Sequence, residues 1–149
     1  MTSEEVRAGE QRLETAPKLS LFVREYGPSS SAGRQPIVLL HGGGQTGASW
    51  GRTAEALAAR GYAVWAPDHR GHGLSDRAPG GDYGIEGFVA DVRAMVRALD
   101  RPPVLVGASL GGIASLLLAG EVDAPEIRAL VLVDIALGAA ASGVERIVH

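Results

Sequence analysis

The chain has 149 residues, enough for one domain with a substantial core, and its 46% hydrophobic and 21% charged content is ordinary for a globular protein. A net charge of −3, without any cluster of lysine or arginine, argues against a nucleic-acid partner. The absence of cysteine excludes disulfides, thiolate metal sites and cysteine nucleophiles. The acidic N-terminus lacks the apolar segment of a signal peptide, and no apolar run reaches the roughly 20 residues of a membrane span, so we expect a cytoplasmic protein without a membrane partner.

The first quarter of the chain predicts a polar terminus followed by a hairpin. Residues 1–10 are polar, and residues 12–26 form two extended runs that are broken near Ala16-Pro17. A Gly/Ser/Pro-rich loop follows at 27–36. We assign 1–18 to the polar N-terminus and the start of the hairpin, and 19–149 to the N-terminal part of a single domain.

From residue 37 onward, apolar strand-like runs alternate with helical patterns. Strands are expected at 37–41, 62–68, 103–109 and 127–134, and helices at 49–60, 83–100 and 110–121. Ser49 is the expected N-cap of the first helix, and Gly61 is its expected stop. Strands that are apolar throughout and separated by helices indicate an α/β fold, a mostly parallel sheet with helices on both faces.

The motifs that could carry chemistry fall where these strands end. HGGG (41–44) follows the first strand of this series, HRGHGLS (69–75) the second, Ser109 ends the third, and Asp134 ends the fourth. Ligands of parallel α/β sheets bind at this edge, beyond the carboxyl ends of the strands. The sequence therefore predicts one site there.

The segment GASLG (107–111), between a strand and a helix, is typical of a nucleophile elbow. The sharp turn predicts a positive φ at Ser109, whose hydroxyl would be exposed at the tip. The backbone N–H of Leu110, in the first helical turn, would be a natural donor to an oxyanion. Gly43 is the expected second donor, because consecutive glycines let a backbone N–H face the site without an obstructing side chain.

Two other interpretations of these residues remain open. Ser109 could be a helix N-cap, which is the commoner role of a serine in a tight strand-to-helix turn. A phosphate-binding loop is less consistent, because the glycine spacing matches neither the dinucleotide fingerprint nor the P-loop with its lysine.

Taken together, the motifs LLHGGG, YAVWAPDHRGHGLSD, VLVGASLGG and LVLVD resemble the α/β-hydrolase superfamily over residues 19–136. The nearest group is that of serine-nucleophile esterases, cofactor-free haloperoxidase-like proteins and C–C bond hydrolases. The resemblance implies that Ser109 is the nucleophile and that Leu110 and Gly43 form the oxyanion hole. It also implies no cofactor or metal, structural roles for His41, His69 and His72, and core positions for Trp50 and Trp65.

The resemblance also implies a triad acid and a triad histidine, which this sequence does not show at the family's usual places. In the family the order is serine, acid, histidine, and the last two follow later strands. We therefore expect a fold truncated after the sixth strand, without the lid and the last two strands, and with 127–134 as an open edge that favours self-association. Asp134 matches an alternative position of the acid, although a turn cap is the simpler role. His149, after SGVERIV, resembles the start of the lid.

The expected function is cleavage of an ester or similar acyl bond of a small molecule through a serine acyl-enzyme, with this chain inactive by itself. Haloalkane dehalogenases and epoxide hydrolases of the superfamily attack with an aspartate at the elbow, a group that Ser109 cannot replace. Two alternatives stay open: a non-catalytic small-molecule-binding protein, and a cofactor-free perhydrolase or haloperoxidase.

Overall fold

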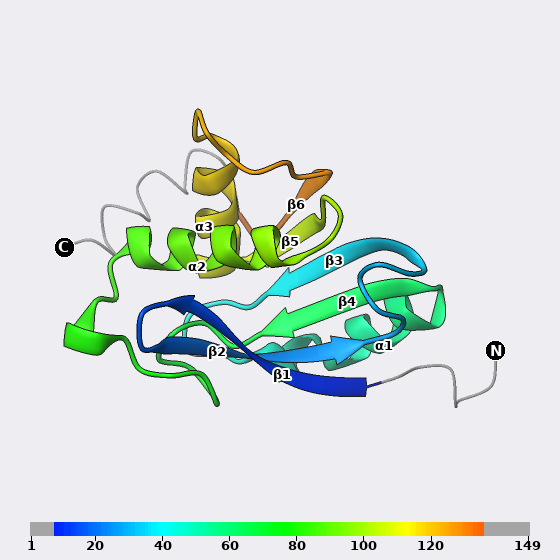
Figure 1. Ribbon diagram of the computed structural model, residues 1–149, viewed down its shortest axis with the longest axis horizontal. Helices are drawn as coiled ribbons and strands as arrows, with labels where there is room; N and C mark the ends of the chain where they lie inside the picture. The colour runs from blue at the N-terminus through cyan, green and yellow to red at the C-terminus, as the bar shows by residue number, and fades with distance from the viewer. Residues whose placement is uncertain (1–7, 136–149) are drawn as a thin grey trace.

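The computed structural model describes residues 8–135, which form one six-stranded sheet covered by helices on both faces (Figure 1). The order across the sheet is β1-β2-β4-β3-β5-β6. β1 and β2 form an antiparallel hairpin, β2 pairs antiparallel with β4, and β3 to β6 are mutually parallel. The strands are β1 (Ala8–Ala16), β2 (Leu19–Tyr26), β3 (Arg34–Leu40), β4 (Tyr62–Pro67), β5 (Val104–Ala108) and β6 (Ala129–Val133).

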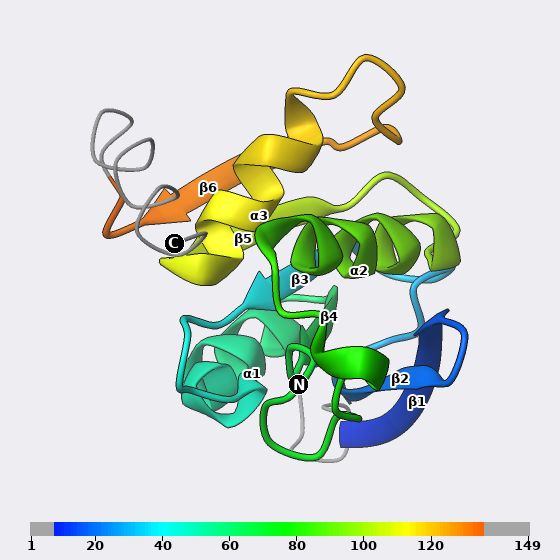
Figure 2. The same cartoon turned by 90° about the vertical axis from the view of Figure 1, so that its left-hand side faces the viewer.

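Three α-helices connect the parallel strands and divide the core into two layers. α2 (Ile85–Ala98) and α3 (Leu110–Ala119) cover one face, and α1 (Gly51–Ala59) covers the other, as the two views show (Figures 1 and 2). Alternate residues of β3 enter the two layers: Val38 and Leu40 face α2 and α3, whereas Ile37 and Leu39 face α1. This two-sided burial explains the uninterrupted apolar run of the strand.

The structure confirms the α/β architecture, the hairpin and every strand and helix expected from the sequence, and corrects two boundaries. β1 begins at Ala8, inside the stretch expected to be a polar terminus, because its residues pair along β2 from Ala8 opposite Tyr26. Ser49 is not the N-cap of α1. A short 3₁₀ helix, η1 (Gly47–Trp50), precedes α1, and the side chain of Thr46 caps it by accepting from Ala48 N.

The turn from β5 into α3 is tight because three glycines remove the side chains that would keep its neighbours apart. A Cβ on Gly107 would lie 2.5 Å from Gly112 Cα, and one on Gly111 would lie 2.5 Å from Leu40 O. The reversal falls on Ser109, with φ 48° and ψ −115°. The expected positive φ is therefore confirmed, and Ser109 is exposed.

Because this conformation is strained for any residue with a Cβ, removing the Cβ should stabilise the protein. We expect Ser109→Gly to raise the free energy of unfolding by about 1 kcal/mol relative to Ser109→Ala, which keeps the strain and loses only an exposed hydroxyl. Urea unfolding at constant m-value measures the difference. A glycine variant no more stable than the alanine variant would show that the elbow is unstrained.

Candidate active site

The loops at the carboxyl ends of the parallel strands bring Ser109 and the glycine loop together, as the sequence predicted. A Cβ on Gly42 would lie 3.4 Å from Ser109 Cβ, and one on Gly43 would lie 3.9 Å from Leu110 Cδ2. Ser109 is therefore exposed at the rim of the sheet with the HGGG segment directly beside it. A small carbonyl compound could reach the hydroxyl from solvent.

Two of the three glycine amides of this loop donate hydrogen bonds to side chains. Gly42 N donates to Gln45 Oε1 at 3.2 Å, and Gly44 N donates to His72 Nε2 at 3.0 Å. Within residues 8–135, Gly43 N has no hydrogen-bond acceptor. The amide that the sequence singled out is thus the one left available in this loop.

The first turn of α3 supplies a second available amide. Gly111 N donates to His41 O at 3.2 Å, and Ile113 N makes the first helical bond, to Ser109 O at 2.9 Å. Leu110 N lies between the elbow and these bonds, and it has no acceptor in the described part of the chain. Its position at the helix N-terminus favours a negatively charged oxygen.

Gln45 is a site residue that the sequence reasoning missed. Its backbone N donates to Gly42 O at 3.2 Å while its side chain accepts from Gly42 N, so it closes the glycine loop in both directions. The available signal was a long amide side chain three residues after a glycine, a spacing that allows such a turn.

Three histidines join the glycine loop to the loop that follows β4. Their ring centroids lie 4.3 Å (His41–His69), 5.1 Å (His41–His72) and 6.1 Å (His69–His72) apart. His41 Nδ1 donates to Gly42 O at 2.7 Å, its Nε2 accepts from His69 N at 2.9 Å, and His69 Nε2 donates to His41 O at 2.9 Å. These partners assign the tautomers and give the rings structural roles.

Burial keeps two of these rings neutral. Both His41 and His69 are fully buried. Burial lowers the pKa of His41, and burial together with the neighbouring His41 ring lowers the pKa of His69 to about 3. Neither ring is available to take a proton from Ser109 at neutral pH.

Asp68 is the buried acidic group beneath these histidines. Its carboxylate accepts from Arg24 Nη1 at 2.6 Å, Gly47 N at 2.7 Å and Leu74 N at 2.9 Å. Burial opposes its ionisation, but the bonds from Leu74, Gly47 and Arg24 outweigh burial and lower the pKa of Asp68. The carboxylate thus connects η1 and the loop after β4 to Arg24 of β2.

A second buried ion pair anchors the loop after β4 to α2. Arg70 Nε and Nη2 donate to Asp91 Oδ2 and Oδ1 at 2.6 and 2.8 Å, and Thr15 Oγ1 donates to Asp91 Oδ1 at 2.6 Å. A Cβ on Gly87 would lie 2.5 Å from Arg70 Nη1, so the glycine makes room for the guanidinium. The sequence reasoning missed this pair; its signal was an aspartate on the apolar face of a helix.

Asp134 lies at the same edge of the sheet as Ser109. Ala108 and Val133 are paired across β5 and β6, and Ser109 and Asp134 are the next residues on these neighbouring strands. Asp134 is exposed and has φ 57°. His149 lies outside the described residues.

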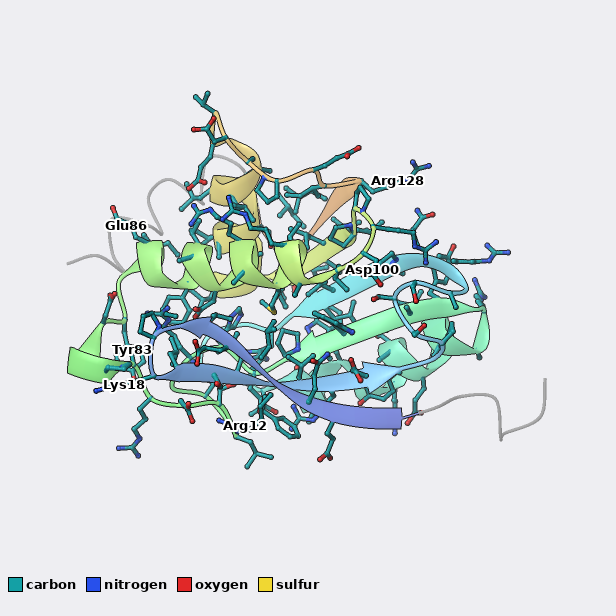
Figure 3. The ribbon with its side chains drawn as sticks, in the orientation of Figure 1. Arg12, Lys18, Tyr83, Glu86, Asp100 and Arg128 are labelled. Atoms are coloured by element: carbon teal, nitrogen blue, oxygen red, sulfur yellow. The ribbon has the colours of Figure 1, made fainter. Side chains whose placement is uncertain are left out.

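The two tryptophans pack into the core layers, and a cavity opens at the far end of the sheet. Trp65 is buried in the core, and Trp50 is half-buried against the α1 layer. A cavity of about 430 Å³, lined by Gln35, Arg101 and Arg128 among others, opens at the amino-terminal ends of the strands, close to where Figure 3 labels Arg128. Tyr83 and Glu86 are labelled at the opposite end of the view, toward which the arrowheads of β3 and β4 point (Figure 3).

The described part of the chain, residues 8–135, lacks two features of other classes of protein. None of its helices combines the length and apolarity needed to cross a membrane. It also contains no group of three or more His, Cys, Asp or Glu side chains placed to hold a metal ion.

The buried histidines and Asp68 predict an acid-sensitive fold. A histidine with a lowered pKa in the folded state binds its proton more readily when unfolded, so acidification below about pH 6.5 favours unfolding. We expect the free energy of unfolding to fall by about 1.4 kcal/mol per pH unit for His69 between its unfolded pKa of about 6.5 and its folded pKa of about 3, with a loss in the same direction from His41 and a further loss below about pH 4 as Asp68 is protonated.

Urea unfolding between about pH 7 and about pH 4 measures this slope. In His69→Gln, the amide nitrogen can still donate to His41 O, but the titrating group is gone. The slope should therefore fall by about 1.4 kcal/mol per pH unit, the contribution of one proton. A slope near zero in the wild-type protein would contradict the buried neutral rings.

Comparisons with known proteins agree with this geometry. The sequence model described as "alpha/beta hydrolase fold" matches residues 35–145. The non-heme chloroperoxidase of Burkholderia pyrrocinia is 36% identical over 99 residues, covering 66% of this chain and 34% of the relative. The probable protein phosphatase methylesterase 1 of Caenorhabditis elegans is 32% identical over 117 residues, covering 74% and 32% respectively.

Among solved structures, a laboratory-evolved variant of a potato epoxide hydrolase superposes with a TM-score of 0.74 at 27% identity, covering 88% of this chain and 41% of that one. The chain spans about a third of the length of the curated relatives it matches. On the family match and on this fold, the chain belongs to the α/β-hydrolase fold family.

Proposed function

We propose that the chain carries the nucleophile and the oxyanion hole of a hydrolase that cleaves an ester or similar acyl bond of a small molecule. The observation that supports this most directly is the placement of two available amides, Gly43 N and Leu110 N, beside the exposed Ser109. A serine that served only as a helix cap would need no donor from a second loop.

In this mechanism Ser109 Oγ bonds to the acyl carbon as its proton passes to a base, and the carbonyl electron pair moves onto oxygen. The N–H groups of Gly43 and Leu110 donate to that oxyanion, each stabilising the transition state by about 3 kcal/mol. Collapse of the tetrahedral intermediate expels the protonated alcohol and leaves an acyl-enzyme, which water then hydrolyses to the acid and free Ser109.

None of the three histidines within residues 8–135 is free to be the base. His41 and His69 are buried and hydrogen-bonded, and both ring nitrogens of His72 are engaged, with Gly44 N and Arg70 O. We propose that the base is a histidine outside these residues, with Asp134 as its acid. Without that base the reaction would be slower by about 10⁴ to 10⁶.

Ser109 argues against epoxide hydrolysis, even though an epoxide hydrolase is among the structural neighbours. Attack of a serine hydroxyl on an epoxide carbon would form an ether, which has no carbonyl for water to attack. A carboxylate nucleophile forms an ester that water can cleave. The hydroxyl at the elbow therefore favours acyl substrates.

A second candidate function is perhydrolysis, favoured by the 36% identity to a non-heme chloroperoxidase. Hydrogen peroxide would replace water as the attacking molecule on the acyl-enzyme. It would release a peracid, which oxidises a halide to hypohalite and returns to the carboxylic acid. Peroxide- and halide-dependent halogenation in acetate buffer, lost in Ser109→Ala, would distinguish this activity from simple hydrolysis.

Covalent labelling tests the proposal directly. A fluorophosphonate should form one adduct, found by mass spectrometry on the peptide that contains Ser109, because the phosphoryl oxygen can occupy the oxyanion hole. Ser109→Ala should abolish the adduct, and Ser49→Ala, at another exposed serine, should not. Adducts spread over several serines, or none at Ser109, would reject the nucleophile; ligand-induced stabilisation without labelling would indicate a binding protein.

A further inference from the structure

We propose that His72 is a positioning residue that holds the Gly43–Gly44 peptide and so keeps the glycine loop, which carries the Gly43 N–H, beside Ser109. This role rests on the proposed function, since it assigns Gly43 to the oxyanion hole. The contact that carries it is the hydrogen bond from Gly44 N to His72 Nε2, 3.0 Å long.

Gly43 has no side chain to restrict its own backbone, so its two flanking peptides must be held from outside. The Gly42–Gly43 peptide is held through Gly42 O, which accepts from His41 Nδ1 at 2.7 Å and from Gln45 N at 3.2 Å. In a trans peptide the N–H points away from the C=O, so these bonds direct Gly43 N–H away from His41 and Gln45.

Among the described residues, only His72 holds the Gly43–Gly44 peptide, through the hydrogen bond from Gly44 N. Gly43, Gly44 and Gln45 are all exposed, and Gly44 has φ 77°, a conformation open chiefly to glycine. Without the bond to His72, this half of the loop would lack a side-chain restraint. The Gly43–Gly44 peptide could then rotate about the ψ of Gly43, and this half of the loop could move away from Ser109.

The His72 ring is itself fixed to a rigid part of the fold. Its Nδ1 donates to Arg70 O at 3.0 Å, and Arg70 is clamped to α2 by its buried pair with Asp91. The bond through Nδ1 places the proton on that nitrogen and leaves Nε2 as the acceptor that Gly44 N requires. Both nitrogens are in use, so His72 positions the loop and is not the base.

Nuclear magnetic resonance of the ¹⁵N-labelled protein tests this without requiring activity. The ring of His72 should be the Nδ1–H tautomer, because Nδ1 donates to Arg70 O and Nε2 accepts from Gly44 N. His72→Gln, whose side-chain oxygen can still accept from Gly44 N, should keep the amide signals of Gly43 and Gly44. In His72→Ala the Gly44 amide should exchange with solvent about tenfold faster or more. An Nε2–H tautomer, or unchanged glycine amides in His72→Ala, would overturn the proposal.

The rate of phosphonate labelling at Ser109 tests whether His72 affects the function of the site. His72→Ala should lower it about tenfold or more, and His72→Gln should restore it to within about twofold. Normal labelling in His72→Ala would overturn the positioning role. Absence of labelling in every variant would instead reject the proposed function, and the amide signals would still decide whether His72 holds the loop.

Discussion

A single carbonyl oxygen, that of His41 at the end of β3, joins the loops that make up the site. It accepts from Gly111 N in the first turn of α3 at 3.2 Å and from His69 Nε2 after β4 at 2.9 Å. The elbow, the glycine loop and the loop after β4 are therefore fixed to one point of the sheet. The tight packing of Gly111 against Leu40 O allows this meeting, because any side chain on Gly111 would push α3 away from β3.

The same arrangement explains why the site holds neutral histidines. An imidazole can donate through one nitrogen and accept through the other, so a buried ring can join two backbone segments without burying a charge. His41 does so between Gly42 O and His69 N. The consequence is a loop geometry that depends on pH, because a proton added to His41 Nε2 replaces the acceptor of the bond from His69 N with a donor.

The sequence was sufficient for the features that depend on local pattern. Apolar runs such as 37–41 located the parallel strands, and the glycines around Ser109 predicted its positive φ, since both follow from sterics within a few residues. It was insufficient for contacts between distant residues: the bidentate Arg70–Asp91 pair spans 21 positions and Gly44–His72 spans 28. Such contacts depend on loop conformations that periodicity does not encode. The prediction of Ser49 as the N-cap was wrong because a 3₁₀ turn precedes α1 and moves its start to Gly51.

The chemistry that we propose for the family member represented here depends on the space beside Ser109 being an oxyanion hole. The crystal structure of the protein with a phosphonate bound covalently to Ser109 Oγ tests this most directly. Our account predicts that the phosphoryl oxygen lies about 2.7 to 3.1 Å from both Gly43 N and Leu110 N. A phosphoryl oxygen directed into solvent, with neither amide within hydrogen-bonding distance, would contradict it.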